Sequence, residues 1–189
     1  MIKIAVVLAS TREGRRGEAV AGWVLDQARQ RSDARFDLVD LAEVNLAHLS
    51  EPMPPAMGRY TQPATQEWAR TVAGYDGFVF VTPEYNHSFP GVLKNALDHV
   101  YAEWNNKAAA FVSYGMDGGV RAVEALRPVM GALQIAVVSA QVALSMHTDF
   151  AGFSDFTPGE HQTAALKSVL DQLVDWSTAL APVRTYSIG

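Results

Sequence analysis

Directly after the first apolar run of the chain comes the sequence STREGRRG, which combines hydroxyl, guanidinium and glycine groups. The hydroxyls of Ser10 and Thr11, the guanidinium of Arg12 and the free amides at the start of a following helix can converge on a phosphate. Gly14 and Gly17 let backbone approach a ligand closely. The same composition also fits a polar connection with exposed arginines. With neither GxxxxGK[ST] nor GxGxxG present, a monophosphate fits this loop better than a triphosphate or a dinucleotide.

A second polar loop, of sequence PEYNHSF, follows a later apolar run and ends near Pro90, where a helix is expected to begin. The ring of Tyr85 offers an aromatic face, Asn86 offers an amide edge, and the amides of residues 84–88 can bond the polar edge of a flat heterocycle. Tyr85 also fits simple packing, and Asn86 also fits an Asx turn. A loop histidine such as His87, without an assigned carboxylate partner, is more often structural than catalytic.

Short β-branched and aromatic runs alternate with longer helical patterns, which predicts βαβ units and an α/β fold with a mostly parallel sheet covered on both faces. Strands are expected at residues 2–9, 35–41, 77–82, 108–114 and 135–141. Helices are expected at residues 17–31, 62–75, 90–103, 119–133 and 159–181. With no internal repeat and no second domain visible, residues 1–189 are expected to form a single domain.

These elements must bring the polar loops together. In a doubly wound parallel sheet of order 2-1-3-4-5, the loops after strands one and three flank the switch point, where flavodoxin binds FMN. A third loop, with Gly115, Gly118 and Gly119, follows the fourth strand. Glycines are natural turn formers, so a structural role fits them well. With a flavin in the crevice, the amides of residues 115–119 would meet its pyrimidine edge and stabilise the negative charge that develops there on reduction.

The composition narrows the function further. The chain has 15 Lys and Arg against 20 Asp and Glu, a formal net charge of -5, which argues against nucleic acid as a partner. It has no cysteine, so it lacks disulfides, thiolate metal sites and a redox thiol, and any redox chemistry must come from a bound cofactor. The opening MIKIAVVLAS is too short for a membrane span and lacks a signal-peptide pattern, so we expect a cytoplasmic protein without a membrane partner.

With these segments placed, the sequence resembles the NADPH-dependent FMN reductase family of flavodoxin-like proteins over nearly the whole chain. The resemblance rests on STREGRRGEAVAGWV, PEYNHSFPGVLKNALDHVYAEW and YGMDGGVRAVEALR, which follow the first, third and fourth strands. It implies a flavodoxin-like three-layer α/β/α sandwich, bound FMN, NADPH or NADH as electron donor, and a homodimer or homotetramer. The implied acceptor is a small molecule: a flavin, a quinone, an azo compound or a metal ion.

The resemblance also implies which residues surround FMN. The phosphate loop would contain Ser10, Thr11, Arg12, Gly17 and Glu18. The isoalloxazine side would contain Pro83, Glu84, Tyr85, Asn86 and Ser88. The other ring edge would be bordered by Ser113, Gly115 and Gly118. Many relatives have Gly where this chain has Ala9. They also have Ser or Thr late in the phosphate loop, where this chain has Arg16 and Gly17. These departures leave open whether Arg15 or Arg16 contacts the phosphate.

In the implied reaction, reduced nicotinamide gives its electrons to the flavin and leaves before a second substrate takes them. Because the flavin carries the chemistry, no side chain need act as a nucleophile. No protein-bound metal is expected. The helix from Pro90 to Trp104 would supply either a subunit interface or ordinary core packing through Leu93, Leu97, Val100 and Tyr101.

Three other functions stay open at this point. The first is an electron-shuttling or flavin-storage protein without a productive nicotinamide site. The second is a redox-responsive protein that docks a client through its proline-rich segment, residues 45–63, which we expect to be an ordered loop or lid. The third is a hydrolase that uses Ser10 or Ser88 with His87, although no GxSxG elbow is present.

Overall fold

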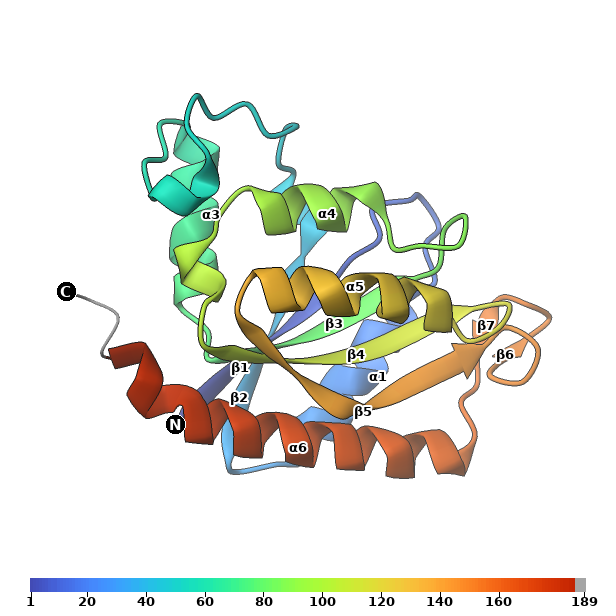
Figure 1. Ribbon diagram of the computed structural model, residues 1–189. Helices are drawn as coiled ribbons and strands as arrows, with labels where there is room; N and C mark the ends of the chain where they lie inside the picture. Colours follow the sequence, from blue (N-terminus) through green and yellow to red (C-terminus); the bar gives the residue numbers. More distant parts are fainter. Residues whose placement is uncertain (186–189) are drawn as a thin grey trace.

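A five-stranded parallel sheet forms the centre of the protein (Figure 1). The computed structural model describes residues 1–185, so residues 186–189 of the predicted domain lie outside the described residues. The strands are β1 (Ile2–Leu8), β2 (Ala34–Asp40), β3 (Gly77–Pro83), β4 (Lys107–Gly115) and β5 (Ile135–Ser145). Their order is β2-β1-β3-β4-β5, and every neighbouring pair is parallel. The predicted fold class and strand order are confirmed.

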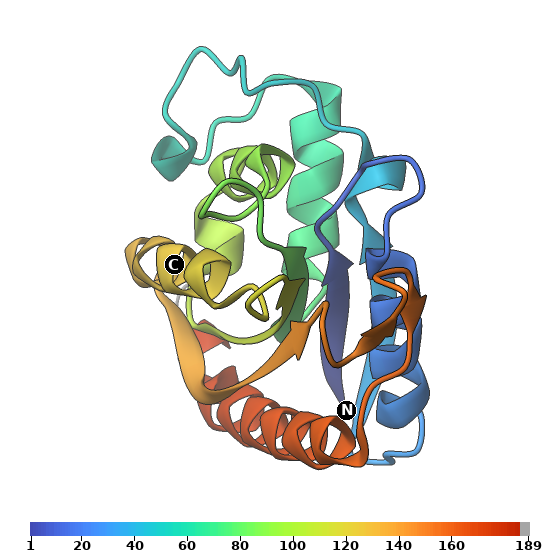
Figure 2. The same ribbon diagram turned by 90° about the vertical axis from the view of Figure 1, so that its right-hand side faces the viewer.

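Helices cover both faces of the sheet, which gives the predicted three layers (Figure 2). One face carries α1 (Gly17–Ala28) and α6 (Glu160–Thr185). The other carries α3 (Pro63–Ala73), α4 (Gly91–Asp98) and α5 (Val120–Ala132). A short helix, α2 (Leu41–Val44), and two 3-10 turns, Pro55–Met57 and Ala102–Trp104, complete the connections. No helix of the described chain has the combined length and apolar character that a membrane span requires.

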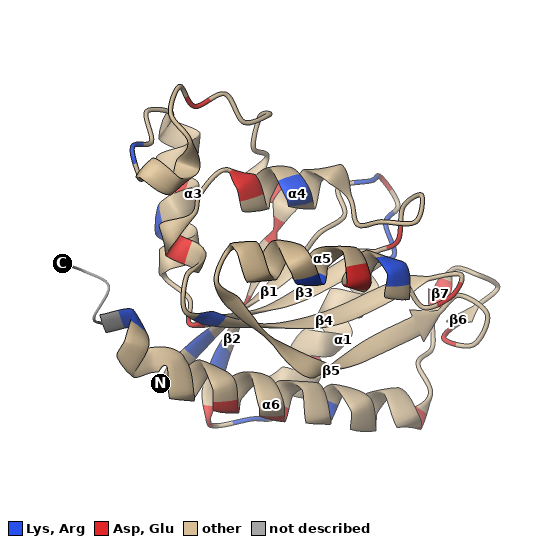
Figure 3. Cartoon of the chain, in the orientation of Figure 1, with Lys and Arg blue, Asp and Glu red and all other residues tan. Residues whose placement is uncertain are grey.

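The sheet has a separate hydrophobic core on each face, and the side chains of a strand contribute to both because successive side chains point to opposite faces. In β1, Ile4, Val6 and Leu8 pack in the core under α1 and α6. Ala5 and Val7, between them, pack in the core under the other three helices. This burial on both faces explains why the strands read as continuous apolar runs. Over the view of Figure 3, acidic and basic residues are interspersed along the helices and loops.

Besides α1 and α6, which end at Ala28 and Thr185 rather than at 31 and 181, two elements differ from the sequence prediction. Strand β5 runs to Ser145, beyond its expected end at 141, because its register on β4 shifts between Ala109 and Phe111 and lets it continue along that strand. It is followed by an unpredicted antiparallel hairpin of β6 (Phe150–Ala151) and β7 (Asp155–Phe156).

The second difference is the helix expected at 90–103, which stops at Asp98. Leu93, Leu97 and Val100 are almost fully buried in the core beneath it. The structure therefore supports core packing for these three positions, rather than a surface available to another subunit.

The proline-rich segment, here called the 45–62 loop, is tied down by its own polar groups. The Glu51 carboxylate accepts hydrogen bonds from the amides of Thr61 and Gln62, at 2.7 and 2.9 Å. The Tyr60 hydroxyl donates to the carboxylate of Glu103 at 2.8 Å, and the carbonyl of Ala47 lies 3.0 Å from Nε2 of His99. The segment is an ordered loop, as expected.

Candidate functional site

The loops after β1, β3 and β4 converge at the carboxyl edge of the sheet, on the right in Figure 1. Between them lies a cleft with a cavity of about 180 Å³. Among the predicted site residues, those that line the cavity are Ser10, Arg12, Pro83, Glu84, Tyr85 and Gly115. Thr11, Gly17, Glu18, Asn86, Ser88, Ser113 and Gly118 belong to the same loops and their flanking elements, but not to the cavity lining. The structure thus brings together three segments far apart in the sequence.

The loop between β1 and α1, here called the 10–16 loop, presents unused hydrogen-bond donors. Within the described chain, no protein oxygen accepts a hydrogen bond from the backbone amides of residues 11–16. The loop leads into α1, whose N-cap residue, Arg16, makes no side-chain cap hydrogen bond within residues 1–185. Free amides and an uncapped helix N-terminus both favour a negatively charged group. The loop therefore has the electrostatics of an anion site.

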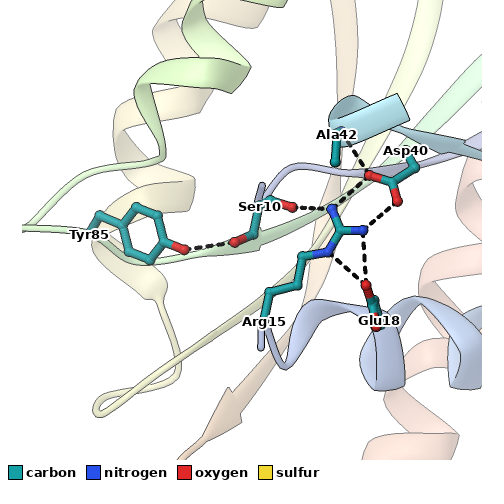
Figure 4. Close-up of polar contacts among 6 residues, drawn as sticks. All are labelled: Ser10, Arg15, Glu18, Asp40, Ala42 and Tyr85. Carbon is teal, nitrogen blue, oxygen red and sulfur yellow. Dashed lines mark hydrogen bonds and ion pairs between the residues drawn. The ribbon is translucent and has the colours of Figure 1, made fainter. Parts of the chain in front are cut away.

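Arg15 is not available as a free cation (Figure 4). Its guanidinium forms a bidentate pair of hydrogen bonds with the Asp40 carboxylate, at 2.7 and 2.5 Å. It also donates to the carbonyl of Ser10 at 2.5 Å. It also pairs with Glu18 at 3.0 Å. The hydrogen bond to Asp40 is the main cause that raises the pKa of Arg15. This side chain braces the 10–16 loop against the end of β2.

The other two arginines of the loop differ from each other. Arg16 donates from Nε to the carbonyl oxygen of Phe153, at 2.6 Å, in the β6–β7 hairpin. Arg12 is exposed and forms no ion pair with the described residues. Its guanidinium carbon lies 6.0 Å from the centroid of the Tyr85 ring. Arg12 is therefore the uncommitted cation of the cleft.

Tyr85 and Ser10 join the second loop to the first, because their hydroxyl oxygens lie 2.7 Å apart (Figure 4). Ser10 is fully buried, whereas Tyr85 is half-buried and faces the cavity. After Tyr85 the chain makes a tight turn, in which the amides of Tyr85 and Ser88 bond each other's carbonyl oxygens at 2.8 and 3.1 Å. Asn86 and His87 have positive φ angles of 48° and 71°, as this turn requires. Asn86 thus has a structural role in the turn.

The backbone amide and the carboxylate of Glu84 both form hydrogen bonds within the protein. Its amide donates to the carbonyl of Tyr114 at 3.0 Å. Its carboxylate accepts from the backbone amide of Arg121 at 3.1 Å and from Nε of the same residue at 2.6 Å. Glu84 therefore caps α5 and braces the second loop to the third. Of the amides at 84–88 that were expected to face a ring, only those of Asn86 and His87 are left without a protein acceptor among the described residues.

The third loop is shaped by Ser113 and two glycines. The fully buried Ser113 hydroxyl donates to the carbonyl of Gly118 at 2.7 Å. Gly119 has φ 70°, and a Cβ there would lie 2.8 Å from the amide nitrogen of Tyr114, so only glycine fits. Gly17 has a comparable role, since a Cβ would lie 2.6 Å from Leu8 Cδ1. These residues shape the cleft from behind its surface.

Sequence reasoning missed Tyr114, Met116 and Met146, which also line the cavity. Tyr114 is the last aromatic residue of the apolar β4 run, and burial raises the pKa of its phenol. Met146 follows β5 directly, and the expected strand end at 141 hid its position. The polar end of an apolar strand is a signal that could have identified Tyr114.

A hydrolase arrangement is not supported by this geometry. Ser10 pairs with Tyr85, and Ser88 uses its backbone to close the turn. Across the described residues, His87 makes no hydrogen bond to either serine. The serine and histidine therefore lack the contact that activates a nucleophile.

Several known proteins are similar to this chain in sequence. The sequence model of the NADPH-dependent FMN reductase family matches residues 2–149. An NAD(P)H-dependent FMN reductase of Schizosaccharomyces pombe is 42% identical over 149 residues, which cover 78% of this chain and 74% of that protein. A 2-hydroxy-1,4-benzoquinone reductase of a Burkholderia species is 34% identical over 147 residues, covering 73% of this chain and 75% of that protein.

Among solved structures, the FerB flavoenzyme NAD(P)H:(acceptor) oxidoreductase of Paracoccus denitrificans has the same fold. It superposes with a TM-score of 0.75 at 22% identity and covers 95% of this chain and 98% of its own. The family predicted from the three loop motifs is confirmed. From its sequence match and its fold, the chain belongs to the NADPH-dependent FMN reductase family.

Proposed function

We propose that the 10–16 loop holds the phosphate of FMN, that the flavin ring lies against Tyr85, and that the protein passes electrons from NADPH or NADH to a small acceptor. The observation that carries this assignment is that, among the described residues, the amides of residues 11–16 have no acceptor and the guanidinium of Arg12 has no ion-pair partner. Donors without protein acceptors fit a dianionic phosphate. The adjacent aromatic face of Tyr85 fits a flat ring.

When bound, FMN would supply the redox chemistry, because it takes up a hydride and can release the electrons to a second substrate. The chain's own residues position and tune the site. Arg15 holds the phosphate loop in shape through Asp40, and Glu84 fixes the second loop to α5. The amides of Met116, Asp117 and Gly119 have no acceptor among the described residues, so they can donate to the polar edge of the ring.

The acceptor is a small molecule, of which free flavins, quinones, azo compounds and metal ions are the candidates. The named relatives that reduce FMN and 2-hydroxy-1,4-benzoquinone support the first two. A homodimer or homotetramer in the cytoplasm completes the proposal.

The phosphate assignment is tested with Arg12→Ala and two flavins. FMN affinity should fall about 10- to 100-fold, because a charge-assisted contact is lost, while the affinity for riboflavin, which lacks the phosphate, should stay the same. Arg59→Ala removes another exposed arginine, from the 45–62 loop, and should change neither affinity. Fluorescence titration measures both constants. Equal losses for FMN and riboflavin would place Arg12 elsewhere than at the phosphate.

Electron transfer is tested by anaerobic titration of the FMN-bound protein with NADPH and then NADH. Bleaching of the flavin absorbance at a catalytic rate is expected, and the two rates rank the donors. Binding of FMN without bleaching by either donor would favour the electron-shuttle alternative.

A further inference from the structure

Phe153 lies in the turn between β6 and β7. This hairpin lies beside the carboxyl edge of the sheet (Figure 1). Its side chain is 50% exposed, whereas the other phenylalanines of the chain are buried or half-buried. Its carbonyl oxygen accepts the hydrogen bond from Arg16, which itself lines the cleft. The hairpin tip is thus fastened to the rim of the candidate flavin site.

The backbone at Phe153 is strained. Its φ is 59°, directly after Gly152 with φ 58°. Glycine and asparagine adopt this left-handed conformation readily, whereas a bulky side chain does so at a cost in conformational energy. The turn itself needs only this backbone shape, which lets the amide of Ser154 bond the carbonyl of Ala151 at 3.1 Å. Neither the exposure of this ring nor its backbone stabilises the fold, which is typical of a residue retained for function.

Phe153 is connected to the cleft lining through neighbouring residues. The ring of His147 meets that of Phe153 edge to face, with centroids 5.4 Å apart. Next to His147, Met146 lines the cavity and donates its amide to the carbonyl of Gly115 at 2.9 Å. Met116, which follows Gly115, is 52% exposed and also lines the cavity. We define these four side chains, Met116, Met146, His147 and Phe153, as the acceptor rim.

We propose that Phe153 and Met116 of the acceptor rim bind the flat, uncharged ring of a quinone-type acceptor and determine its KM, an inference that rests on the proposed function. An aromatic ring stacks on a flat ligand, and flexible thioethers adapt to rings of different shape. Met116 and Met146 of the rim line the cleft, and Phe153 is bonded to Arg16, which lines it too, so a ring held at the rim lies beside the proposed flavin site. NAD(P)H and one proton from solvent together supply the two electrons and two protons that convert the quinone to a hydroquinone, leaving NAD(P)+.

The test is Phe153→Asn, because asparagine fits the left-handed turn. With 2-methyl-1,4-naphthoquinone as acceptor, KM should rise about 5-fold through loss of ring stacking. The KM for NADPH, the kcat/KM with ferricyanide and the FMN affinity should not change. The thermal midpoint of the variant should equal or exceed that of the wild type, since strain is relieved. Met116→Gln should raise the naphthoquinone KM in the same direction, by about 2-fold.

Trp176→Gln is the matched control, because Trp176 is 49% exposed on α6, outside the cleft lining. An unchanged naphthoquinone KM in Phe153→Asn, or an equal loss of activity with ferricyanide, overturns the proposal. Dissociation of an oligomer with no change in KM would instead mark the rim as a contact between copies of the chain. If the wild type fails to oxidise NADPH, the proposed function is wrong. Equilibrium dialysis of the naphthoquinone against FMN-bound wild type and FMN-bound Phe153→Asn still decides whether Phe153 binds the ring.

Discussion

The 10–16 loop and the 45–62 loop are both irregular and polar, yet the protein treats their polar groups differently. In the 45–62 loop, Glu51, Tyr60 and the carbonyl of Ala47 all have partners within the fold. In the 10–16 loop, a run of backbone amides and the guanidinium of Arg12 have none among the described residues. The longer, proline-rich loop is thus fastened to the rest of the fold by these groups, whereas the free donors of the shorter one lie beside the cavity.

This difference teaches which feature of a loop indicates binding. The 45–62 loop has free amides too, but those of the 10–16 loop lie beside a cavity and at a helix N-terminus, where they can bind an anion. Length and proline content, by contrast, describe only how a connection crosses the surface. If the comparison is right, changes in the 45–62 loop should alter stability alone, and changes in the 10–16 loop should alter FMN binding.

The largest effect is expected from Arg15→Met, which removes the brace of the 10–16 loop. The side chains of Arg15 and Asp40 are 11% and 8% exposed, so the variant leaves a buried carboxylate without its cationic partner. Unfolding free energy should fall by about 3–5 kcal/mol, and FMN affinity should fall with it because the loop loses its shape. Urea denaturation and FMN titration measure the two effects.

Arg29→Met provides the control for that experiment. Arg29 pairs with Asp26 at 3.2 Å, but both side chains are about 70% exposed. Its loss should change the unfolding free energy by less than about 0.5 kcal/mol. If Arg15→Met is as mild as this control, Asp40 does not brace the loop.

A smaller effect is expected from Tyr60→Phe in the 45–62 loop. The variant loses the hydrogen bond to Glu103 and the one accepted from the amide of Tyr101, at 2.8 and 3.2 Å. Unfolding free energy should fall by about 1–2 kcal/mol, while FMN affinity stays unchanged. Tyr101→Phe, which loses only a contact with the exposed Gln134, is the matched control. Weaker FMN binding by Tyr60→Phe would break the comparison, because the 45–62 loop would then belong to the site.

The smallest effect is expected from Glu51→Gln and depends on pH. Desolvation acts to raise the pKa of Glu51, but hydrogen bonds from the Thr61 and Gln62 amides and the Thr61 hydroxyl lower it from 4.5 to about 2. Because the folded pKa is the lower one, the carboxylate stabilises the fold above pH 4.5, and this contribution is lost as the pH falls toward 2.

The thermal midpoint of Glu51→Gln should therefore lie below that of the wild type at pH 7, and the gap should close between pH 4.5 and 2. Calorimetric scans over that range measure it, with Glu43→Gln as the exposed reference. A gap that stays constant down to pH 3 would show that the hydrogen bonds do not depend on the charge of Glu51.

The sheet and its order were predictable because they follow from local pattern: apolar runs alternating with helical periods. The same holds for the position of the cleft, since parallel strands place their carboxyl ends at one edge. The end of β5 was not predictable, because it depends on a register shift against Ala109 and Phe111 of another strand. Local periodicity carries no information about such a pairing.

The roles of the three arginines could not be separated from sequence. Arg15 is engaged by Asp40, 25 residues further on, and Arg16 by Phe153, 137 residues further on. Arg12 is left over only once both pairings are known. Likewise, the sequence resemblance implies that Glu84 lies beside the flavin, and only the fold shows that its carboxylate is bonded to Arg121. Side chains of one type in one loop acquire different roles through partners that only the tertiary structure supplies.

The Glu84 carboxylate also makes the cleft electrically asymmetric. It covers the backbone amide of Arg121 and so offsets the positive pole of α5, whereas the start of α1 has no side-chain cap. Of these two helix N-termini, that of α1 therefore attracts negative charge more strongly. We expect a molecule with an anionic tail and a neutral, planar head to enter one way round, its tail toward α1 and its head toward α5. The orientation of the ligand would then be decided by the field of the backbone.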